Sequence, residues 1–307
     1  MTVKPHHKKK RIMKIALHDA DNTKFPNLAL MKLSAWHKST GNETSIYESL
    51  LHSTYDLVYS SKVFTFTNTE KPFGTVVYGG TGYKSPMTLP DECEHIMPDY
   101  DLYECKQSYG FLTRGCIRNC EWCLVPKKEG KIRANADIDE FLAHKECILL
   151  DNNILACDHG IEQLEKIAHL GIKIDINQGI DARLIDDGIA KRLAKCKWLH
   201  PIRLACDTKY QMKDIQKAVT LLRWNNATPR AYFVYMLVRD DIEDAIERVK
   251  FLKGLDLTPY ASVYRDYENK IKKTKEQEQF QRFVNRRWIF KSCTWEDYDT
   301  SMRHKNV

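Results

Sequence analysis

Three cysteines lie close together in the segment Gly110–Pro126. Cys116, Cys120 and Cys123 are spaced Cys-x3-Cys-x2-Cys, after a short apolar segment and before a lysine-rich turn. Thiolates at such short spacing converge on one soft centre, either zinc or an iron–sulfur cluster, because a short loop wraps a single metal site with little further ordering. A structural zinc site normally has a fourth protein ligand, whereas a cubane held by three cysteines keeps one iron open. The spacing therefore predicts a metal-binding loop.

The loop also carries an aromatic residue, Trp122, directly before its last cysteine. The sequence thus resembles the radical S-adenosylmethionine (SAM) superfamily, whose signature is Cys-x3-Cys-x-aromatic-Cys. In that family the cysteines bind a [4Fe–4S] cluster, and SAM chelates the unique iron. One-electron reduction cleaves SAM to methionine and a 5′-deoxyadenosyl radical, which abstracts hydrogen from the substrate. The resemblance implies Cys116, Cys120 and Cys123 as cluster ligands, Trp122 beside the SAM adenine, and an electron donor such as flavodoxin or ferredoxin.

The composition is that of an ordinary globular protein, with 307 residues, 43% apolar and 29% charged. No apolar run is long enough to cross a bilayer, and the basic stretch Lys8–Arg11 precedes only a brief apolar segment, which argues against a secretory signal. Ten cysteines, several of them in apolar strand-like runs, fit a reducing compartment better than a disulfide framework. We therefore expect a cytoplasmic protein without membrane contact.

Basic residues gather near both ends of the chain, which has a net charge of +7. One cluster spans Lys4–Lys14. The other interleaves cations with aromatic residues: Arg282, Phe283, Arg286, Arg287, Trp288, Phe290 and Lys291. Such a pattern can follow a phosphate backbone and stack on bases, and a solvated tail and an ordinary amphipathic C-terminal helix explain the same pattern. A nucleic acid is therefore a candidate partner.

The N-terminal region, residues 1–80, predicts a small open α/β domain of Rossmann-like type. We expect a helix after Pro26 and strands at Arg11–Leu17, Ser45–Tyr47, Asp56–Ser60 and Gly74–Gly80. This order resembles the cobalamin-binding-like N-terminal domain of one branch of radical SAM enzymes, here shortened. The Asp-x-His-x-x-Gly element that ligates cobalt in many such domains is missing, which disfavours cobalamin. Residues 81–107, rich in prolines and acids, are expected to form a linker.

Residues 108–266 alternate strand-like and helix-like segments. We expect strands at Tyr109–Thr113, Glu146–Leu150, Lys173–Asn177, Ile202–Cys206, Ala231–Val238 and Thr258–Val263, and helices at Asp137–His144, Ile161–Leu170, Asp187–Lys195, Met212–Trp224 and Ile242–Leu255. Such alternation builds a parallel sheet with helices outside. Six units are too few for an eight-unit barrel but fit a partial (β/α)6 barrel, the core fold of the radical SAM family. Residues 267–307 are expected to form a C-terminal helical extension.

Polar residues follow the second and third predicted strands, at the ends where barrel chemistry is placed. The family often has a Gly-Gly-Glu element after the second strand, which binds the SAM amino group. Here Asp151, Asn152 or Asn153 would have to supply these acceptors. Asn177 at the end of the third strand and Arg183 just beyond it are further candidates for binding SAM.

The fourth and fifth strands add the candidate catalytic residues Arg203, Asp207 and Tyr235. Buried charges need partners, so Arg203 is expected either to pair with Asp175 or Asp207 as a structural contact, or to reach the SAM carboxylate or a polar substrate. Tyr235 is placed to donate or relay a hydrogen, although a barrel tyrosine is more often a packing residue.

The sequence as a whole predicts a radical SAM enzyme that abstracts hydrogen from an unidentified substrate. The basic ends favour a nucleic acid or nucleotide, and a peptide is the alternative. The rival class is a zinc or iron–sulfur protein that binds nucleic acid without catalysis. A protein of that class would have a fourth metal ligand, and its affinity for nucleic acid would fall steeply as the salt concentration rises.

Overall fold

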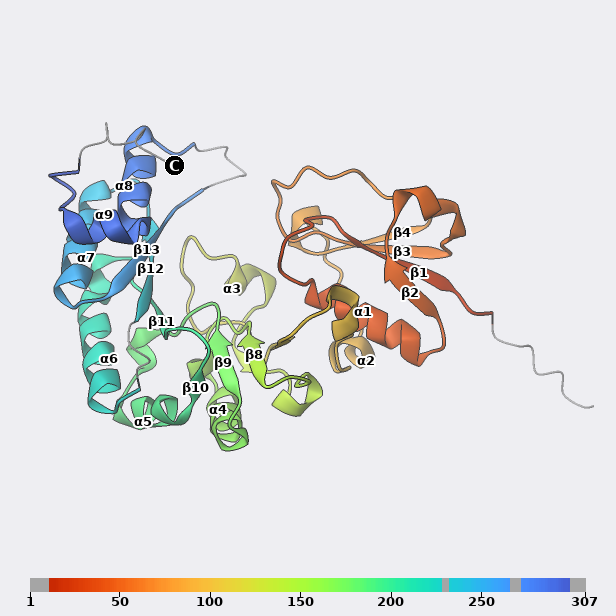
Figure 1. Ribbon diagram of the computed structural model, residues 1–307, viewed down its shortest axis with the longest axis horizontal. Coiled ribbons are helices and arrows are strands. Elements are labelled where there is room, and N and C mark those ends of the chain that lie inside the picture. The colour runs from red at the N-terminus through yellow and green to blue at the C-terminus, as the bar shows by residue number, and fades with distance from the viewer. Residues whose placement is uncertain (1–10, 228–231, 266–271, 299–307) are drawn as a thin grey trace, which may run out of the picture. The chain divides into compact units, whose positions relative to one another are not determined.

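The computed structural model describes residues 11–227, 232–265 and 272–298 (Figure 1). They form two compact units, each described here by itself. The first comprises the described residues up to Lys106 together with Glu140–Leu142, and the second comprises the rest. Of residues 81–107, expected as a linker, those up to Lys106 are grouped with the first unit and Gln107 with the second. Of the basic cluster at Lys4–Lys14, residues 4–10 lie outside the described residues, as do Ala231 and Asp266.

The first unit is built on a parallel sheet in the strand order β2-β1-β3-β4. Its strands are β1 (Lys14–Asp19), β2 (Glu43–Ile46), β3 (Leu57–Ser61) and β4 (Val76–Gly79), and helix α1 (Leu28–Ser39) connects the first two. The shorter elements are the 3-10 helices η1 (Ser49–Thr54), η2 (Thr81–Tyr83) and η3 (Tyr100–Tyr103) and the α-helix α2 (Asp91–Glu94). The small open α/β layer predicted for this region is present, and its strand pairs are all parallel.

The core of the first unit forms where α1 packs on β1. Leu30 and Leu33 of the helix meet Ile15 and Leu17 of the strand, and Cys93 is fully buried among them. Burial raises the pKa of the Cys93 thiol to about 11, because the charged thiolate loses its hydration. Cys93 therefore acts as a small apolar core residue at neutral pH.

The second unit contains parallel strands that follow one another in chain order. One sheet has the order β10-β9-β8-β5, another has the order β11-β12-β13, and the parallel bridge Ile180↔Leu204 joins them. The strands are β5 (Ser108–Gly110), β8 (Glu146–Leu149), β9 (Lys173–Ile176), β10 (Lys197–Trp198), β11 (Arg203–Ala205), β12 (Phe233–Val238) and β13 (Thr258–Val263). The predicted parallel α/β alternation is confirmed.

Helices connect these strands and bury one face of the sheet (Figure 1). They are α4 (Asp158–Leu170), α5 (Asp187–Lys195), α6 (Met212–Trp224) and α7 (Ile242–Gly254), with the short turns η5 (Ile154–Ala156), η6 (Ala182–Leu184) and η7 (Lys209–Gln211). Along β12 the buried residues Val234, Met236 and Val238 alternate with half-buried ones. Only one face of this strand is therefore fully covered. None of the helices in the described residues is long and apolar enough to cross a membrane.

The segment between β5 and β8 differs from the prediction. The expected strand Tyr109–Thr113 divides into β5 and β6 (Thr113–Arg114), which pairs antiparallel with β7 (Arg133–Ala134) around the short helix α3 (Val125–Lys128). The helix expected at Asp137–His144 was wrong, since only the turn η4 (Ile138–Glu140) forms. Gln163 of α4 accepts from the Ile138 amide (2.9 Å) and donates to Asp137 (2.8 Å). These long-range contacts outweigh the local helical pattern.

Helix α8 (Lys275–Asn285) lies along the edge strand β13 and is followed by α9 (Arg287–Ser292). The Asn285 side chain accepts from the Ala261 amide (2.7 Å) and donates to the Ala261 carbonyl (2.9 Å). Gln281 donates to the same carbonyl at 3.0 Å. Side-chain amides thus satisfy edge groups that would otherwise be open to pairing with another chain.

Replacing Asn285 with alanine is expected to lower the free energy of unfolding by about 1–2 kcal/mol, because the part-buried Ala261 amide loses its acceptor. Urea denaturation measures the change. Gln279→Ala, in the same helix but without a comparable contact to β13, is the matched control and should stay within about 0.5 kcal/mol of wild type. Equal losses in the two variants would contradict an edge-capping role.

Candidate cluster and cofactor site

The cysteine loop follows β6 and begins at Gly115, which has a backbone φ of +83°. A Cβ at this position would collide with the backbone of Gly130 and Lys131. The Cys116 amide donates to the Gly130 carbonyl at 3.2 Å, so the loop folds back on the chain that leaves it. Glycine is required here because no other residue tolerates both the close approach and the positive φ.

Asp151 joins the end of β8 to the chain just before the cysteine loop. Its buried carboxylate accepts from the Thr113 amide (2.6 Å), the Thr113 hydroxyl (2.7 Å) and the Leu112 amide (3.3 Å). These bonds occupy both carboxylate oxygens. Asp151 therefore anchors the chain just before the cysteine loop. Its neighbours Asn152 and Asn153 are left as the candidates for accepting a hydrogen bond from the SAM amino group.

Burial raises the pKa of Asp151 to about 6, although the hydrogen bonds from Thr113 and Leu112 oppose the shift. The folded pKa lies above the ordinary 3.8, so the folded state binds more protons between these values. We expect the free energy of unfolding to fall by about 3 kcal/mol in all, at 1.36 kcal/mol per unit of difference between the two pKa values, as pH rises from well below about 4 to well above about 6. Urea titrations across this range should show the fall in wild type and lose it in Asp151→Asn. Parallel pH profiles would contradict the assignment.

Asn152 and Asn153 have different partners. Asn152 donates to the Glu129 carboxylate at 2.9 Å. The Asn153 amide nitrogen donates to the Cys116 sulfur and to Asp181, both at 3.4 Å. Its oxygen, Oδ1, is buried and has no hydrogen-bond partner among the described residues. A buried acceptor beside a cysteine of the loop is a place for a donor group of a ligand, because leaving it unpaired costs stability.

The three cysteines of the loop are all partly buried. Burial raises the pKa of Cys120 and Cys123, and the neighbouring sulfurs raise both further, whereas Arg183 opposes the shift at Cys120. The amide of Arg118 also donates to the Cys116 sulfur at 3.3 Å. Within the described residues, no three His, Cys, Asp or Glu side chains form a group compact enough to hold one metal ion.

Trp122 lies against the chain that follows β12. The Arg239 guanidinium is 4.8 Å from the Trp122 ring centroid, within cation–π range. Arg239 is also 3.4 Å from the Glu121 carboxylate. These contacts link the cysteine loop to the C-terminal end of β12. That strand belongs to the β11-β12-β13 sheet, whereas β5 belongs to the other parallel sheet of this unit.

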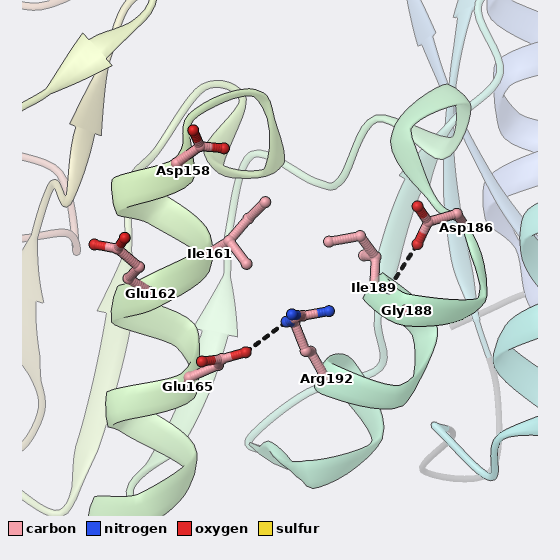
Figure 2. A pocket seen from close by; sticks show the side chains of 8 residues that line it. All are labelled: Asp158, Ile161, Glu162, Glu165, Asp186, Gly188, Ile189 and Arg192. Atoms are coloured by element: carbon pink, nitrogen blue, oxygen red, sulfur yellow. Dashed lines mark hydrogen bonds and ion pairs between the residues drawn. The ribbon is translucent and has the colours of Figure 1, made fainter.

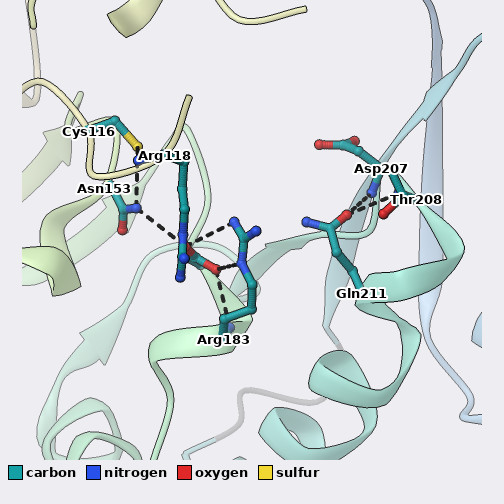
Figure 3. A network of polar contacts seen from close by, with 8 residues as sticks. Cys116, Arg118, Asn153, Arg183, Asp207, Thr208 and Gln211 are labelled. Carbon is teal, nitrogen blue, oxygen red and sulfur yellow. Dashed lines mark hydrogen bonds and ion pairs between the residues drawn. The ribbon is translucent and has the colours of Figure 1, made fainter. Parts of the chain in front are cut away.

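Polar side chains surround Asp181, which lies after β9. Figure 3 labels three of them, Arg118, Asn153 and Arg183. Arg183 forms two side-chain bonds to the Asp181 carboxylate, at 2.6 and 3.0 Å, and Arg118 forms another at 2.9 Å. Burial alone would raise the pKa of Asp181, but the bonds from Arg183 and Arg118 outweigh it and leave this pKa below its ordinary value. The sequence analysis missed Arg118 and Asp181. The alternating charges of Asp181-Ala-Arg183 after a buried strand were the available signal.

The three candidate catalytic residues lie on the face of the sheet away from the helices or at its end. Arg203 forms a largely buried ion pair with Asp175, the first of the two partners considered for it. The Tyr235 hydroxyl donates to the Asn177 carbonyl at 3.2 Å. Asp207, the other partner considered for Arg203, accepts a hydrogen bond from the Leu237 amide at 3.0 Å. Arg203 is thus neutralised within the protein.

A buried arginine on α7 holds the ends of β11 and β12 together. Arg248 is 1% exposed and donates to the carbonyls of Cys206 (2.8 Å) and Leu237 (2.9 Å) and to the Asp244 carboxylate (2.7 Å). It thereby fixes the backbone on which Asp207 is carried. The sequence analysis missed it, although a cation on the apolar stripe of α7, among Ala245, Val249 and Leu252, was a usable signal.

A surface groove of about 320 Å³ lies between α4 and α5 (Figure 2). Asp186 caps α5 by accepting from the Ile189 amide at 2.7 Å, and Arg192 bridges to Glu165 at 2.5 Å. These polar groups therefore serve the helices themselves. None of the residues predicted for the site lines this groove, which is formed by Asp158, Ile161, Glu162, Glu165, Asp186, Gly188, Ile189 and Arg192.

The fold is similar to that of a solved radical SAM enzyme. The radical S-adenosylmethionine methyltransferase TsrM from Kitasatospora setae, with its tryptophan substrate and the SAM analogue aza-SAM bound, superposes with a TM-score of 0.61 at 12% sequence identity. The match covers 82% of this chain and 73% of that one. No family model and no curated protein matches the sequence. At this identity the likeness shows a shared fold.

Proposed function

We propose that this protein is a radical SAM enzyme, which cleaves SAM reductively and uses the resulting radical to abstract hydrogen from a substrate. The observation that carries the proposal is the Cys-x3-Cys-x-Trp-Cys loop at the C-terminal ends of parallel strands, in a fold shared with a radical SAM methyltransferase. In this proposal the strands of the second unit form the partial six-unit barrel, with the loop at its mouth.

The residues of the loop suit a [4Fe–4S] cluster bound by Cys116, Cys120 and Cys123. Cubane ligands bind different irons, so a cluster does not require the compact group that a single zinc ion needs. When bound, the cluster supplies the electron that cleaves SAM. The Arg118 amide and the Asn153 side chain, both directed at the Cys116 sulfur, would stabilise its thiolate form by hydrogen bonding.

The polar groups beside the loop suit the amino-acid end of SAM. The unpaired, buried Oδ1 of Asn153 would accept from the amino group. Arg183 would bind the carboxylate, since a guanidinium matches carboxylate geometry. Trp122, covered on one side by Arg239, would pack near the adenine. In this proposal Asp151 anchors the cysteine loop. Asn152 donates to Glu129 and contributes to the site only through that contact.

On the substrate side, the chain offers a half-buried sheet face that carries Arg203, Tyr235 and, at its end, Asp207. Arg203 is already compensated by Asp175, and the Tyr235 hydroxyl is held by Asn177. We assign them to shaping this face and excluding water from it, which protects a radical reaction.

A nucleic acid or nucleotide is the substrate class to test first, with a peptide as the second. The C-terminal cluster supports the first class only in part, because Phe283 and Phe290 are buried in the core. Trp288 is 63% exposed and lies between exposed arginines and a lysine on α9, so it is the residue left for stacking.

Anaerobic reconstitution tests the proposed reaction. Protein loaded with iron and sulfide, then given SAM and dithionite, should form 5′-deoxyadenosine, and reduced flavodoxin or ferredoxin should replace dithionite. Added oligonucleotides or peptides that raise the yield identify the substrate class. Stoichiometric zinc in protein purified without reconstitution, no 5′-deoxyadenosine after loading, and salt-sensitive binding to RNA would instead establish the zinc-protein alternative.

A further inference from the structure

Asp181 receives side chains from three separate parts of the second unit. Arg118 comes from the cysteine loop, Asn153 from the end of β8, and Arg183 from the turn after β9. The Asp181 side chain is only 8% exposed. Because the Asp181 carboxylate bonds to all three segments, it fixes their relative placement. A segment that shifts loses its contact with this carboxylate.

Two guanidinium groups, Arg118 and Arg183, share the Asp181 carboxylate, so the hydrogen-bonded network itself holds one more cation than anion. Arg183 also interacts electrostatically with Cys120, Asp207 and Asp214. Among the described residues, Arg183 uses its Nε and one Nη donor on Asp181, and the remaining donors of the fork are available to an anion. A carboxylate group is the anion whose planar shape such a fork binds best.

We infer that Asp181 is a positioning residue: it ties Arg118 of the cysteine loop to the turn after β9 and there orients Arg183 to receive the carboxylate of SAM. The inference rests on the proposed function. Asp181 itself contacts neither the cluster nor SAM in this scheme. Its effect passes through Arg183, which without it is free to swing toward solvent, since the Arg183 side chain is 31% exposed.

The test measures SAM binding to cluster-loaded protein without reductant, so that no cleavage occurs. Equilibrium dialysis should show SAM binding about 10–100-fold weaker in Asp181→Asn, the loss typical of a residue that supports a ligand. Asp181→Glu, which keeps the charge, should recover part of it. Asp187→Asn is the matched control: among the described residues Asp187 pairs with Lys191, one turn further along α5, and with Asn225 at the end of α6, so this variant should bind SAM like wild type.

A double-mutant cycle separates positioning from general damage. If Asp181 acts through Arg183, the double variant Asp181→Asn/Arg183→Gln should bind SAM no more weakly than Arg183→Gln alone. The electron paramagnetic resonance spectrum of the reduced cluster should also change less on adding SAM in Asp181→Asn than in wild type. Arg183→Gln is informative even if Asp181→Asn folds poorly, because it leaves Asp181 paired with Arg118.

Several outcomes would overturn the inference while leaving the proposed function intact. These are wild-type SAM affinity in Asp181→Asn or in Arg183→Gln, or fully additive losses in the double variant. A different result bears on the proposed function itself: wild-type protein with a complete cluster that neither binds nor cleaves SAM would overturn it, and the role of Asp181 with it.

Discussion

Replacing Cys120 with alanine is expected to abolish 5′-deoxyadenosine formation. Cys120 is the middle thiol of the loop, and two cysteines cannot replace three as ligands of a cubane with one open iron. The loss should exceed the roughly 10–100-fold that removal of a merely supporting residue costs. Iron and sulfide content, the visible absorption of the cluster and the 5′-deoxyadenosine yield, all measured after anaerobic reconstitution, report the effect.

The matched control for this variant is Cys157→Ala. Cys157 is also partly buried, but it precedes α4 and lies outside the cysteine loop. It should leave cluster content and SAM cleavage close to wild type. If Cys120→Ala retained both, or if the two variants lost them equally, Cys120 would not be a cluster ligand and the loop would need another explanation.

Replacing Arg248 with methionine is expected to lower the free energy of unfolding by about 3–5 kcal/mol. The change preserves much of the buried volume but removes one partner of a largely buried ion pair, to Asp244, together with the donors to the Cys206 and Leu237 carbonyls. A carboxylate and two carbonyls are then left without these bonds, and breaking a buried pair from one side is strongly destabilising.

Urea denaturation with matched slopes measures this loss. Arg192→Met on α5 is the control, because Arg192 forms an exposed ion pair with Glu165 (Figure 2) and should cost less than about 1 kcal/mol. A loss of similar size in both variants would show that Arg248 contributes only an ordinary helix contact. Because Arg248 holds the backbone around Asp207, a folded Arg248→Met protein is also expected to cleave SAM more slowly.

Elements with a strong local pattern could be predicted from the sequence. Helices α5 and α6 span the expected Asp187–Lys195 and Met212–Trp224, and β13 spans the expected Thr258–Val263. Amphipathic periodicity and capping residues act within one element, so a single stretch of sequence contains the information. The segment at Asp137–His144 shows the limit, since its conformation depends on Gln163 in the next helix.

The candidate site divides in the same way. By itself the sequence determined the cysteine spacing with Trp122 and the strand ends that carry the polar candidates, because both are properties of adjacent residues. Only the tertiary structure decided that Arg203 pairs with Asp175, that Asn153 keeps a free buried oxygen, and that Asp181 meets Arg118, 63 positions away. Partners of buried polar groups are chosen by which strands become neighbours and by what burial leaves unsatisfied, and neither is contained in a local pattern.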